Sequence, residues 1–342
     1  MSTITFAIES SCDETSAAVL RNGAVISNIV SSQYFHKEYG GIVPELASRA
    51  HIQVIDEIVT RAFKDAGIDK DEVSLMAASQ GPGLIGSLLV GYNYAKGFAL
   101  SRDIPFMGID HIESHLFSCF IGQEEINFPF IALVVSGGHT ILFLVESYLS
   151  YKILGNTHDD AAGEAFDKVA KMLGLEYPGG PLIDKLASTG NPQFHKFPKS
   201  IIKGSPYDFS FSGIKTSVLY FLKNNYPVDK TNLPLNDIAA SFQSAVTGSL
   251  IDKTIRAAKD HNIKTIAVSG GVSANSGLRN GFLKYEKEGY SIYFPEKIYS
   301  TDNAAMIGYN AYLKFKASVG NAAINNVNPL LSSAYARFKY QQ

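Results

Sequence analysis

Hydrophobic and polar positions divide the first hundred residues into short strand-like runs and longer stretches with helical spacing. Residues 4–20 form two apolar runs around a polar turn, which predicts an antiparallel hairpin, and residues 24–33 predict a third strand. From 42 to 66 the apolar residues recur every three or four positions, which is typical of an amphipathic helix. A buried strand at 75–79 and a glycine turn lead into a second helix that ends near residue 100.

The same order partly recurs later in the chain. The elements expected there are strands at 130–135 and 140–145, a helix at 161–173, a strand at 265–269 and a helix at 303–316. A glycine turn follows both the strand at 130–135 and the strand at 265–269. The repetition predicts two α/β lobes of similar topology around a central cleft.

Bulk properties change this interpretation little. With 342 residues, 46% of them hydrophobic, the chain is long enough for two domains with separate cores. The formal net charge of -2 provides no global attraction for phosphate, so a nucleic-acid partner would need a local basic patch or a second protein. Cys12 and Cys119 form no disulfide framework, and we find no signal peptide or bilayer-length apolar run, so we expect a cytoplasmic protein with no membrane contact.

The stretch DHIESH at 110–115 is the first candidate for chemistry. His111 and His115 are four residues apart, so on a helix they lie on one face and can share a metal ion. Two polar histidines on an ordinary helix would show the same spacing. The zinc-protease motif H-E-x-x-H is not present, because Ile112 follows the first histidine and the general base of that mechanism is missing. Cys119 lies about 12 Å along such a helix from His111, too far away to complete the site.

Glycine turns and acidic residues are the next candidates. Asp302 precedes an Ala-rich helix, where capping is its default role, although an exposed carboxylate is also a hard metal ligand. The glycine turns at 81–83, 137–138 and 270–271 each follow a strand, and together they favour a nucleotide-sized ligand whose phosphate or ribose approaches backbone N–H groups.

Carboxylates gather near the second predicted lobe. They are either a solvated acidic face or acceptors for the hydroxyls of a ribose or another polar substrate: Asp159, Asp160, Glu164, Asp167 and Asp184. The loop at 189–208, with Lys215 beyond it, is the best basic surface of the chain. Glu14 fits either a cleft or a turn, and Cys12 is better explained as a small buried residue than as a nucleophile.

Nine motifs in order and spacing resemble one family, the universal tRNA threonylcarbamoyltransferase catalytic subunits, once labelled glycoproteases. They are ESSCDET at 9–15, GGIVPELASRAH at 40–51, GPGLIGSLLVG at 81–91, HIESH at 111–115, VSGGHT at 135–140, DDAAGEAFDKVAKMLGLEYPGGP at 159–181, DFSFSGIKT at 208–216, SGGVSAN at 269–275 and STDNAAMIGY at 300–309. The resemblance covers residues 4 to about 317. The family commonly has threonine at the position of Ser10, histidine at Asp110 and glycine at Ser114.

The resemblance implies an α/β, actin-like ATPase fold with two similar lobes around a central cleft. We expect an N-terminal lobe at 1–108, completed by a C-terminal helix at about 309–342, and a C-terminal lobe at 109–308. It also implies that His111, His115 and Asp302 hold one divalent metal ion, Fe²⁺ or Zn²⁺.

The implied reaction is acyl transfer. Family members pass the threonylcarbamoyl group of threonylcarbamoyl-AMP to N6 of the adenosine beside the anticodon (position 37), in tRNAs that read codons beginning with adenine, and AMP leaves. The resemblance assigns the binding of this adenylate to Val134, Val135, Ser136, Gly137, Gly138, Asp167, Gly180, Asp184 and Asn275. His139 is a candidate for proton transfer from N6, and no other catalytic residue is assigned.

Implied partners are tRNA, a paralogous inactive dimerisation subunit (TsaB-like) and a P-loop ATPase (TsaE-like), and the helix at 42–66 is our candidate for the dimer surface. Two alternatives from other classes stay open at this stage. An actin-like sugar kinase or ATPase would need carboxylate-held magnesium and an Asp base, whereas the two histidines favour a softer metal. A non-catalytic scaffold would be indicated by loss of a metal ligand, and all three are present.

Overall fold

The computed structural model describes residues 2–123, 127–199, 202–227, 232–318 and 331–337. It divides into two compact units, one formed by Met1–Ile126 with Thr301–Gln342 and the other by Asn127–Ser300. The two units thus divide at 126/127 and 300/301, whereas the lobes predicted from the sequence divide at 108/109 and 308/309. The expected C-terminal helix at about 309–342 corresponds to α9 (Ala304–Ala317), and residues 319–330 and 338–342 lie outside the described part.

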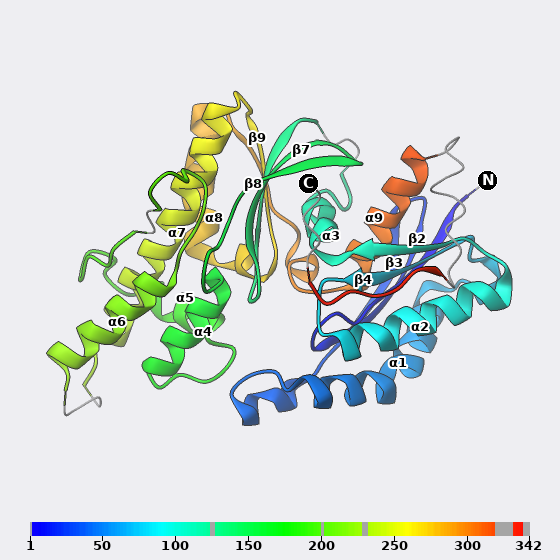
Figure 1. Ribbon diagram of the computed structural model, residues 1–342, viewed down its shortest axis with the longest axis horizontal. Coiled ribbons are helices and arrows are strands. Elements are labelled where there is room, and N and C mark those ends of the chain that lie inside the picture. The colour runs from blue at the N-terminus through cyan, green and yellow to red at the C-terminus, as the bar shows by residue number, and fades with distance from the viewer. Residues whose placement is uncertain (1, 124–126, 200–201, 228–231, 319–330, 338–342) are drawn as a thin grey trace. The chain divides into compact units, whose positions relative to one another are not determined.

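The first unit is built on a five-stranded sheet of order β3-β2-β1-β4-β5 (Figure 1). Its strands are β1 (Ile4–Glu9), β2 (Glu14–Arg21), β3 (Ala24–Ser32), β4 (Leu75–Gly81) and β5 (Phe106–Asp110). The first three pair antiparallel, with Ile8 opposite Ala17, and β4 and β5 continue from β1 in parallel. β1 is therefore central and buried over its whole length.

Helices cover both faces of this sheet. They are α1 (Pro44–Ala66), α2 (Ile85–Arg102), α3 (His111–Ser118) and α9. Alternation along β1 directs Phe6 and Ile8 into the core formed with α1 and α2, while Ala7 faces Gly308 of α9. A Cβ at Gly308 would lie 2.4 Å from a Leu20 methyl carbon and 3.1 Å from the Ala7 Cβ, so glycine permits this close packing.

The second unit repeats the sheet with the order β10-β9-β6-β7-β8. Its strands are β6 (Phe130–Val135), β7 (Thr140–Ser147), β8 (Ser150–Asn156), β9 (Thr265–Ser269) and β10 (Ser291–Tyr293). Again the first three are antiparallel, and β9 and β10 extend the sheet from β6 in parallel. The two units therefore share strand order and direction, which confirms the predicted repeat.

The helices of the second unit are α4 (Ala162–Met172), α5 (Gly179–Ala187), α6 (Ser212–Asn225), α7 (Leu235–Asp260) and α8 (Ser276–Leu283). Phe242, Val246 and Leu250 of α7 pack with Leu133 of β6 and Phe166 of α4 in one buried core. Short 3₁₀ helices in the two units occupy Tyr34–Tyr39, Lys70–Glu72, Gly271–Ala274, Lys284–Glu288 and Lys297–Tyr299.

All the elements predicted from the pattern are present within two residues of their expected bounds, and the largest differences, of two residues each, are at the start of α1 and at the ends of α2, β4 and β7. Within the described ranges, none of the helices combines the length and apolar character needed to cross a membrane.

Candidate metal centre

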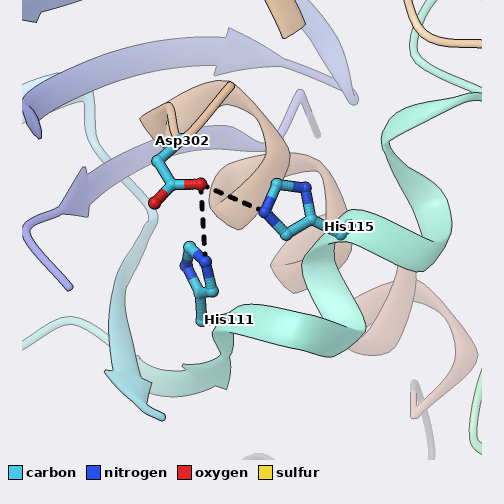
Figure 2. A group of neighbouring side chains, drawn as sticks. All are labelled: His111, His115 and Asp302. Carbon is cyan, nitrogen blue, oxygen red and sulfur yellow. Dashed lines mark hydrogen bonds and ion pairs between the residues drawn. The ribbon is translucent and has the colours of Figure 1, made fainter. Parts of the chain in front are cut away.

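Three side chains from distant parts of the sequence meet in the first unit (Figure 2). His111 and His115 lie on one face of α3, and Asp302 lies just before α9. One carboxylate oxygen of Asp302 is 3.2 Å from Nε2 of His115 and 3.5 Å from Nε2 of His111. The centroids of the two imidazole rings are 4.9 Å apart, and the ring planes meet at 89°. In Figure 2 both Nε2 atoms face the same carboxylate. The predicted pairing of the histidines and their proximity to Asp302 are thus present.

Local capping explains how each element presents its ligand. Asp110 caps α3, because its Oδ1 accepts the Glu113 N–H at 2.9 Å. Asn303 caps α9 by accepting the Met306 N–H at 3.1 Å. The default role of Asp302 as the helix cap is therefore wrong, because the next residue does that work and leaves the Asp302 carboxylate beside the histidines.

Two residues at the end of β1 hold the His111 ring. Nδ1 of His111 lies 3.0 Å from Oε2 of Glu9 and 3.2 Å from Oγ of Ser11. A buried carboxylate holds a proton on Nδ1, and Nε2 is then the nitrogen that faces Asp302. Burial lowers the pKa of His111, but the charges of Asp302 and Glu9 outweigh burial and raise it to about 9.

Further acidic residues surround this cluster. Burial raises the pKa of Glu14 well above its ordinary value, and Asp302, Asp13 and Glu9 raise it further. The pKa of the Cys12 thiol is also raised well above its usual range, by burial and by the charges of Asp13, Asp302 and Glu14. Cys12 therefore stays protonated, which supports its interpretation as a small packed residue. Glu14 belongs to the acidic surroundings of the candidate site and not to an isolated turn.

The donor set fits a cation. The ligand atoms of His111, His115 and Asp302 all lie within 4.8 Å of one another. Two imidazole nitrogens and one carboxylate oxygen suit Zn²⁺ and Fe²⁺, and three protein donors leave coordination positions open. Burial is the main cause of the raised pKa values of Cys12 and Glu14, and the nearby carboxylates add to it, so a divalent cation here would offset negative charge. The cluster could therefore hold one divalent metal ion.

The glycine turn between β6 and β7 is built on backbone contacts. The Ser136 N–H donates to the His139 carbonyl at 2.8 Å, and the His139 N–H donates to the Ser136 Oγ at 3.1 Å. Val134 and Val135 are fully buried in the sheet, so a ligand could meet only the backbone of these two residues. Gly137 and Gly138 are exposed at the tip of the turn.

The remaining residues assigned to the adenylate lie on helices of the second unit. Asp167 of α4 accepts the Gly179 N–H at 2.7 Å, and burial raises its pKa against the effect of the Gly179 and Gly180 N–H groups. The Asp184 carboxylate of α5 accepts hydrogen bonds from the Ser276 N–H at 3.0 Å and from the Ser276 hydroxyl at 2.7 Å. Asn275 caps α8 and donates to the side chain of Gln243 at 2.7 Å. Gln243 also donates to Asp184, at 3.0 Å, so these residues are joined in one network.

The other acidic and basic candidates have structural partners. Asp159 accepts the N–H groups of Phe211 and Ser212 at the start of α6. Burial would raise the pKa of Asp160, but its bonds to Lys168 and Lys215 outweigh burial and lower it. Lys199 pairs with Asp252, so the expected basic surface is partly neutralised by carboxylates.

Comparison with known proteins decides the family. Residues 24–309 match the family model described as TsaD, tRNA N6-adenosine threonylcarbamoyltransferase. A protein of that name from Chlorobium chlorochromatii is 51% identical over 344 residues, covering 96% of this chain and 97% of its own. Another from Clostridium perfringens is 49% identical, covering 94% and 96%. The chain belongs to this family.

Membership in the tRNA N6-adenosine threonylcarbamoyltransferase family confirms the interpretation as an enzyme that transfers threonylcarbamoyl groups to tRNA. Solved structures agree on the fold alone. Full-length HypF in a phosphate- and nucleotide-bound form aligns with a TM-score of 0.62 at 15% identity, over 94% of this chain and 56% of that one. Component A of the Acidaminococcus fermentans (R)-2-hydroxyglutaryl-CoA dehydratase aligns with a TM-score of 0.52 at 16% identity, over 92% and 98%. With the two similar sheets, these alignments confirm the actin-like fold.

Two residues that support the candidate metal site were not predicted from the sequence. Glu9 contacts His111 across 102 positions of sequence, and Tyr335 contacts Asp110 across 225. A glutamate that ends an otherwise apolar buried strand was a usable signal for Glu9, because a buried carboxylate needs a partner. The pattern around Tyr335 contains no comparable signal.

Proposed function

We propose that this chain passes the threonylcarbamoyl group of threonylcarbamoyl-AMP to N6 of the adenosine beside the anticodon, in tRNAs that read codons beginning with adenine. The observation that carries the proposal is the meeting of His111, His115 and Asp302 in a chain of this family. In the reaction, N6 forms a bond to the carbamoyl carbon, the bond from that carbon to the phosphate oxygen breaks, and AMP leaves with the bonding electrons.

His111, His115 and Asp302 would hold a single divalent metal ion, with Fe²⁺ preferred and Zn²⁺ as the alternative. When bound, such an ion supplies Lewis acidity toward a carbonyl oxygen. The chain contributes the orientation of its donors. Glu9 keeps Nδ1 of His111 protonated, and the burial of His115 holds its ring in place while Asp302 adds a negative charge.

We assign the adenylate end of the substrate to Val134, Val135, Ser136, Gly137, Gly138, Asp167, Gly180, Asp184 and Asn275. Support comes from the exposed backbone of the glycine turn and from Gly180, where a Cβ would meet nothing within 4 Å. Asp184 and Asn275 are engaged with Ser276 and Gln243, so we expect them to shape the pocket as well as contact the ligand.

His139 is our candidate for accepting the N6 proton. Its backbone closes the glycine turn, which fixes its Cα next to the proposed adenylate site. The His139→Ala enzyme tests this role, because full turnover in that variant would assign the proton to solvent. A loss of turnover relative to wild type that is largest at high pH, where the imidazole is neutral, and that shrinks as pH falls would support histidine as the base.

Partners complete the proposal. We expect tRNA, a paralogous inactive dimerisation subunit and a P-loop ATPase, with α1 at the dimer surface. Ile52 of α1 is 64% exposed, and Ile85 and Leu89 of α2 are 46% and 44% exposed, which supports an apolar contact on these helices. Cys12 and Cys119 form no disulfide in the described part of the chain, which agrees with the proposed cytoplasmic location.

The test is incorporation of labelled threonine into tRNA. Purified wild type and the His111→Ala/His115→Ala variant are each supplied with tRNA, the partner proteins and threonylcarbamoyl-AMP that carries the label in its threonine part. Label in tRNA with wild type alone supports the transferase and its dependence on the histidines. Absence of label with both, when the adenylate and partners are verified as active, would contradict the proposal and favour a magnesium-dependent kinase.

A further inference from the structure

The segment Leu331–Arg337 lies along the end of β4 and the start of the following glycine turn. The Tyr335 N–H donates to the Gln80 carbonyl at 2.9 Å, and the Gln80 amide donates to the Ser333 carbonyl at 2.8 Å. The Gly83 N–H donates to the Ala336 carbonyl at 3.2 Å. Two backbone bonds and one side-chain bond therefore hold the segment against the end of β4 and the turn that follows it.

Side chains of α2 and the core secure the same segment. Lys96 donates to the Ser332 carbonyl at 2.9 Å, and the Tyr92 hydroxyl donates to the Ser332 Oγ at 2.9 Å. Ala334 packs against the core of the first unit. A Cβ at Gly81 would lie 2.1 Å from the Tyr335 carbonyl oxygen, so glycine is required for this close approach. The segment is therefore positioned by several independent contacts.

Tyr335 connects this segment to the helix that carries the candidate ligands. Its hydroxyl donates to Oδ2 of Asp110 at 2.6 Å, while Oδ1 of the same carboxylate caps α3 through the Glu113 N–H at 2.9 Å. A hydroxyl–carboxylate bond this short belongs to the strong, charge-assisted class. One carboxylate thus joins the C-terminal segment to the first turn of α3.

The length of α3 makes this contact consequential. A helix of eight residues has little intrinsic stability, so its direction depends on its caps and its packing. His111 is the first residue of α3, directly after Asp110. A small change in the cap would therefore move the His111 ring, and metal sites lose affinity when supporting groups no longer fix their ligands.

We propose that Leu331–Arg337 is a strap that fixes the candidate metal helix, and that Tyr335 is a positioning residue acting through Asp110. This inference rests on the proposed metal site at His111, His115 and Asp302. Within the strap, the Tyr335 hydroxyl is the group whose hydrogen bond reaches the cap of α3.

The experiment measures Co²⁺ affinity by chelator competition, together with the visible spectrum of bound Co²⁺, in the purified full chain. Tyr335→Phe is expected to weaken affinity by about threefold to tenfold, below the range for partners that contact a ligand directly. We expect the Co²⁺ spectrum to shift as well, because the geometry of the ligands changes. A merely structural loss would lower the unfolding temperature of the metal-free chain and leave the spectrum unchanged.

Tyr94→Phe is the matched control. Its hydroxyl also contacts a carboxylate, Asp56, at 3.3 Å, and among the described residues this hydroxyl bonds to neither the strap nor α3. Affinity in this variant is expected to equal that of wild type. Asp110→Ala and the Asp110→Ala/Tyr335→Phe double variant complete a cycle in which the second change adds little, because alanine already removes the carboxylate that accepts from the Tyr335 hydroxyl.

The outcomes separate the two proposals. Wild type that binds Co²⁺ no better than His115→Ala would overturn the metal site and the strap with it. Wild type that binds well, with Tyr335→Phe within about twofold and an unchanged spectrum, would overturn the strap alone. Additive effects of Asp110→Ala and Tyr335→Phe would show that Tyr335 does not act through Asp110.

Discussion

Glu9 and His111 form a buried pair in which a carboxylate oxygen lies 3.0 Å from Nδ1 of the imidazole. The Glu9 side chain is fully buried, and its other oxygen accepts the backbone N–H of Ser11. The pair links the last residue of β1 to the first residue of α3. The central strand of the sheet thereby sets the orientation of a candidate ligand.

Replacing Glu9 should weaken metal binding without removing a ligand. Outer partners of metal-bound histidines commonly change affinity by about 10- to 100-fold. We expect Glu9→Gln near the lower end of that range, because an amide oxygen can still accept from Nδ1, and Glu9→Ala near the upper end. Chelator competition with Zn²⁺ measures the affinities, and circular dichroism verifies folding.

Ser11→Ala is the control for this prediction. Its hydroxyl is 3.2 Å from the same nitrogen, but the Glu9 carboxylate remains in place. We expect a loss of less than about threefold, since the stronger charged partner is retained. Equal affinity for wild type and Glu9→Ala would show that the carboxylate does not orient His111.

His51 should make stability depend on pH. Its Nδ1 lies 2.7 Å from the Thr15 hydroxyl and its Nε2 lies 3.0 Å from the Cys12 carbonyl, so the neutral ring is fully bonded. Burial lowers the pKa of His51 below 6.5, against the opposing effect of the Cys12 carbonyl. The unfolded chain therefore takes up a proton at higher pH than the folded chain does.

The sign follows from that difference. The stabilisation is complete above the unfolded pKa and is lost as pH falls from about 6.5 toward the folded pKa, with a limiting slope of about 1.4 kcal/mol per pH unit. Denaturant unfolding of wild type and His51→Gln between pH 8 and pH 5.5 measures how the free energy of unfolding changes with pH. The wild type should lose more stability than the variant over this interval. Parallel curves would remove His51 as the cause.

The histidine pair could be predicted from sequence because its four-residue spacing is local. Asp302 could not be placed in this way, since 187 positions separate it from His115 and only the fold brings them together. The family resemblance supplied that residue. The local pattern instead suggested a capping role, which belongs to Asn303 because its side chain reaches the Met306 N–H.

The longest helix, α7, was missed for a physical reason. It is buried on most of its surface, and its buried positions include the polar residues Ser241, Gln243, Thr247 and Lys253. Their polarity interrupts the apolar spacing by which a helix is identified. Several of these groups are satisfied within the helix, as when the Thr247 hydroxyl donates to the Gln243 carbonyl at 2.8 Å. Short edge strands such as β10, with three residues, leave too little pattern to detect.

Asp184 should contribute to stability as well as to the proposed adenylate site. Its carboxylate joins α5 to α8 and α7 through Ser276 and Gln243. Asp184→Ala removes the acceptor from these donors, and we expect a loss of about 1–3 kcal/mol in unfolding free energy. Denaturant unfolding checks this value. Ser276→Ala keeps the backbone bond and should cost less, so an equal loss in both variants would contradict the assigned role of the carboxylate.

Gly163 should control the shape of the turn between β6 and β7. Its N–H donates to the Ser136 carbonyl at 3.1 Å, and a Cβ there would lie 2.6 Å from the Ser136 oxygen and 2.8 Å from the Gly137 Cα. Gly163→Ala therefore pushes the turn away from α4. We expect the KM for threonylcarbamoyl-AMP to rise about tenfold or more, with about 1–3 kcal/mol of destabilisation from overpacking.

Gly213→Ala tests whether this effect is specific to the turn. Gly213 lies in α6, and a Cβ there would meet nothing within 4 Å. Alanine in that helix should leave the KM unchanged and stabilise the chain by up to about 1 kcal/mol, because glycine is the poorer helix former. Steady-state kinetics and thermal unfolding of both variants give the comparison. An unchanged KM in Gly163→Ala, with the expected loss of stability, would place the adenylate away from Ser136 and Gly137.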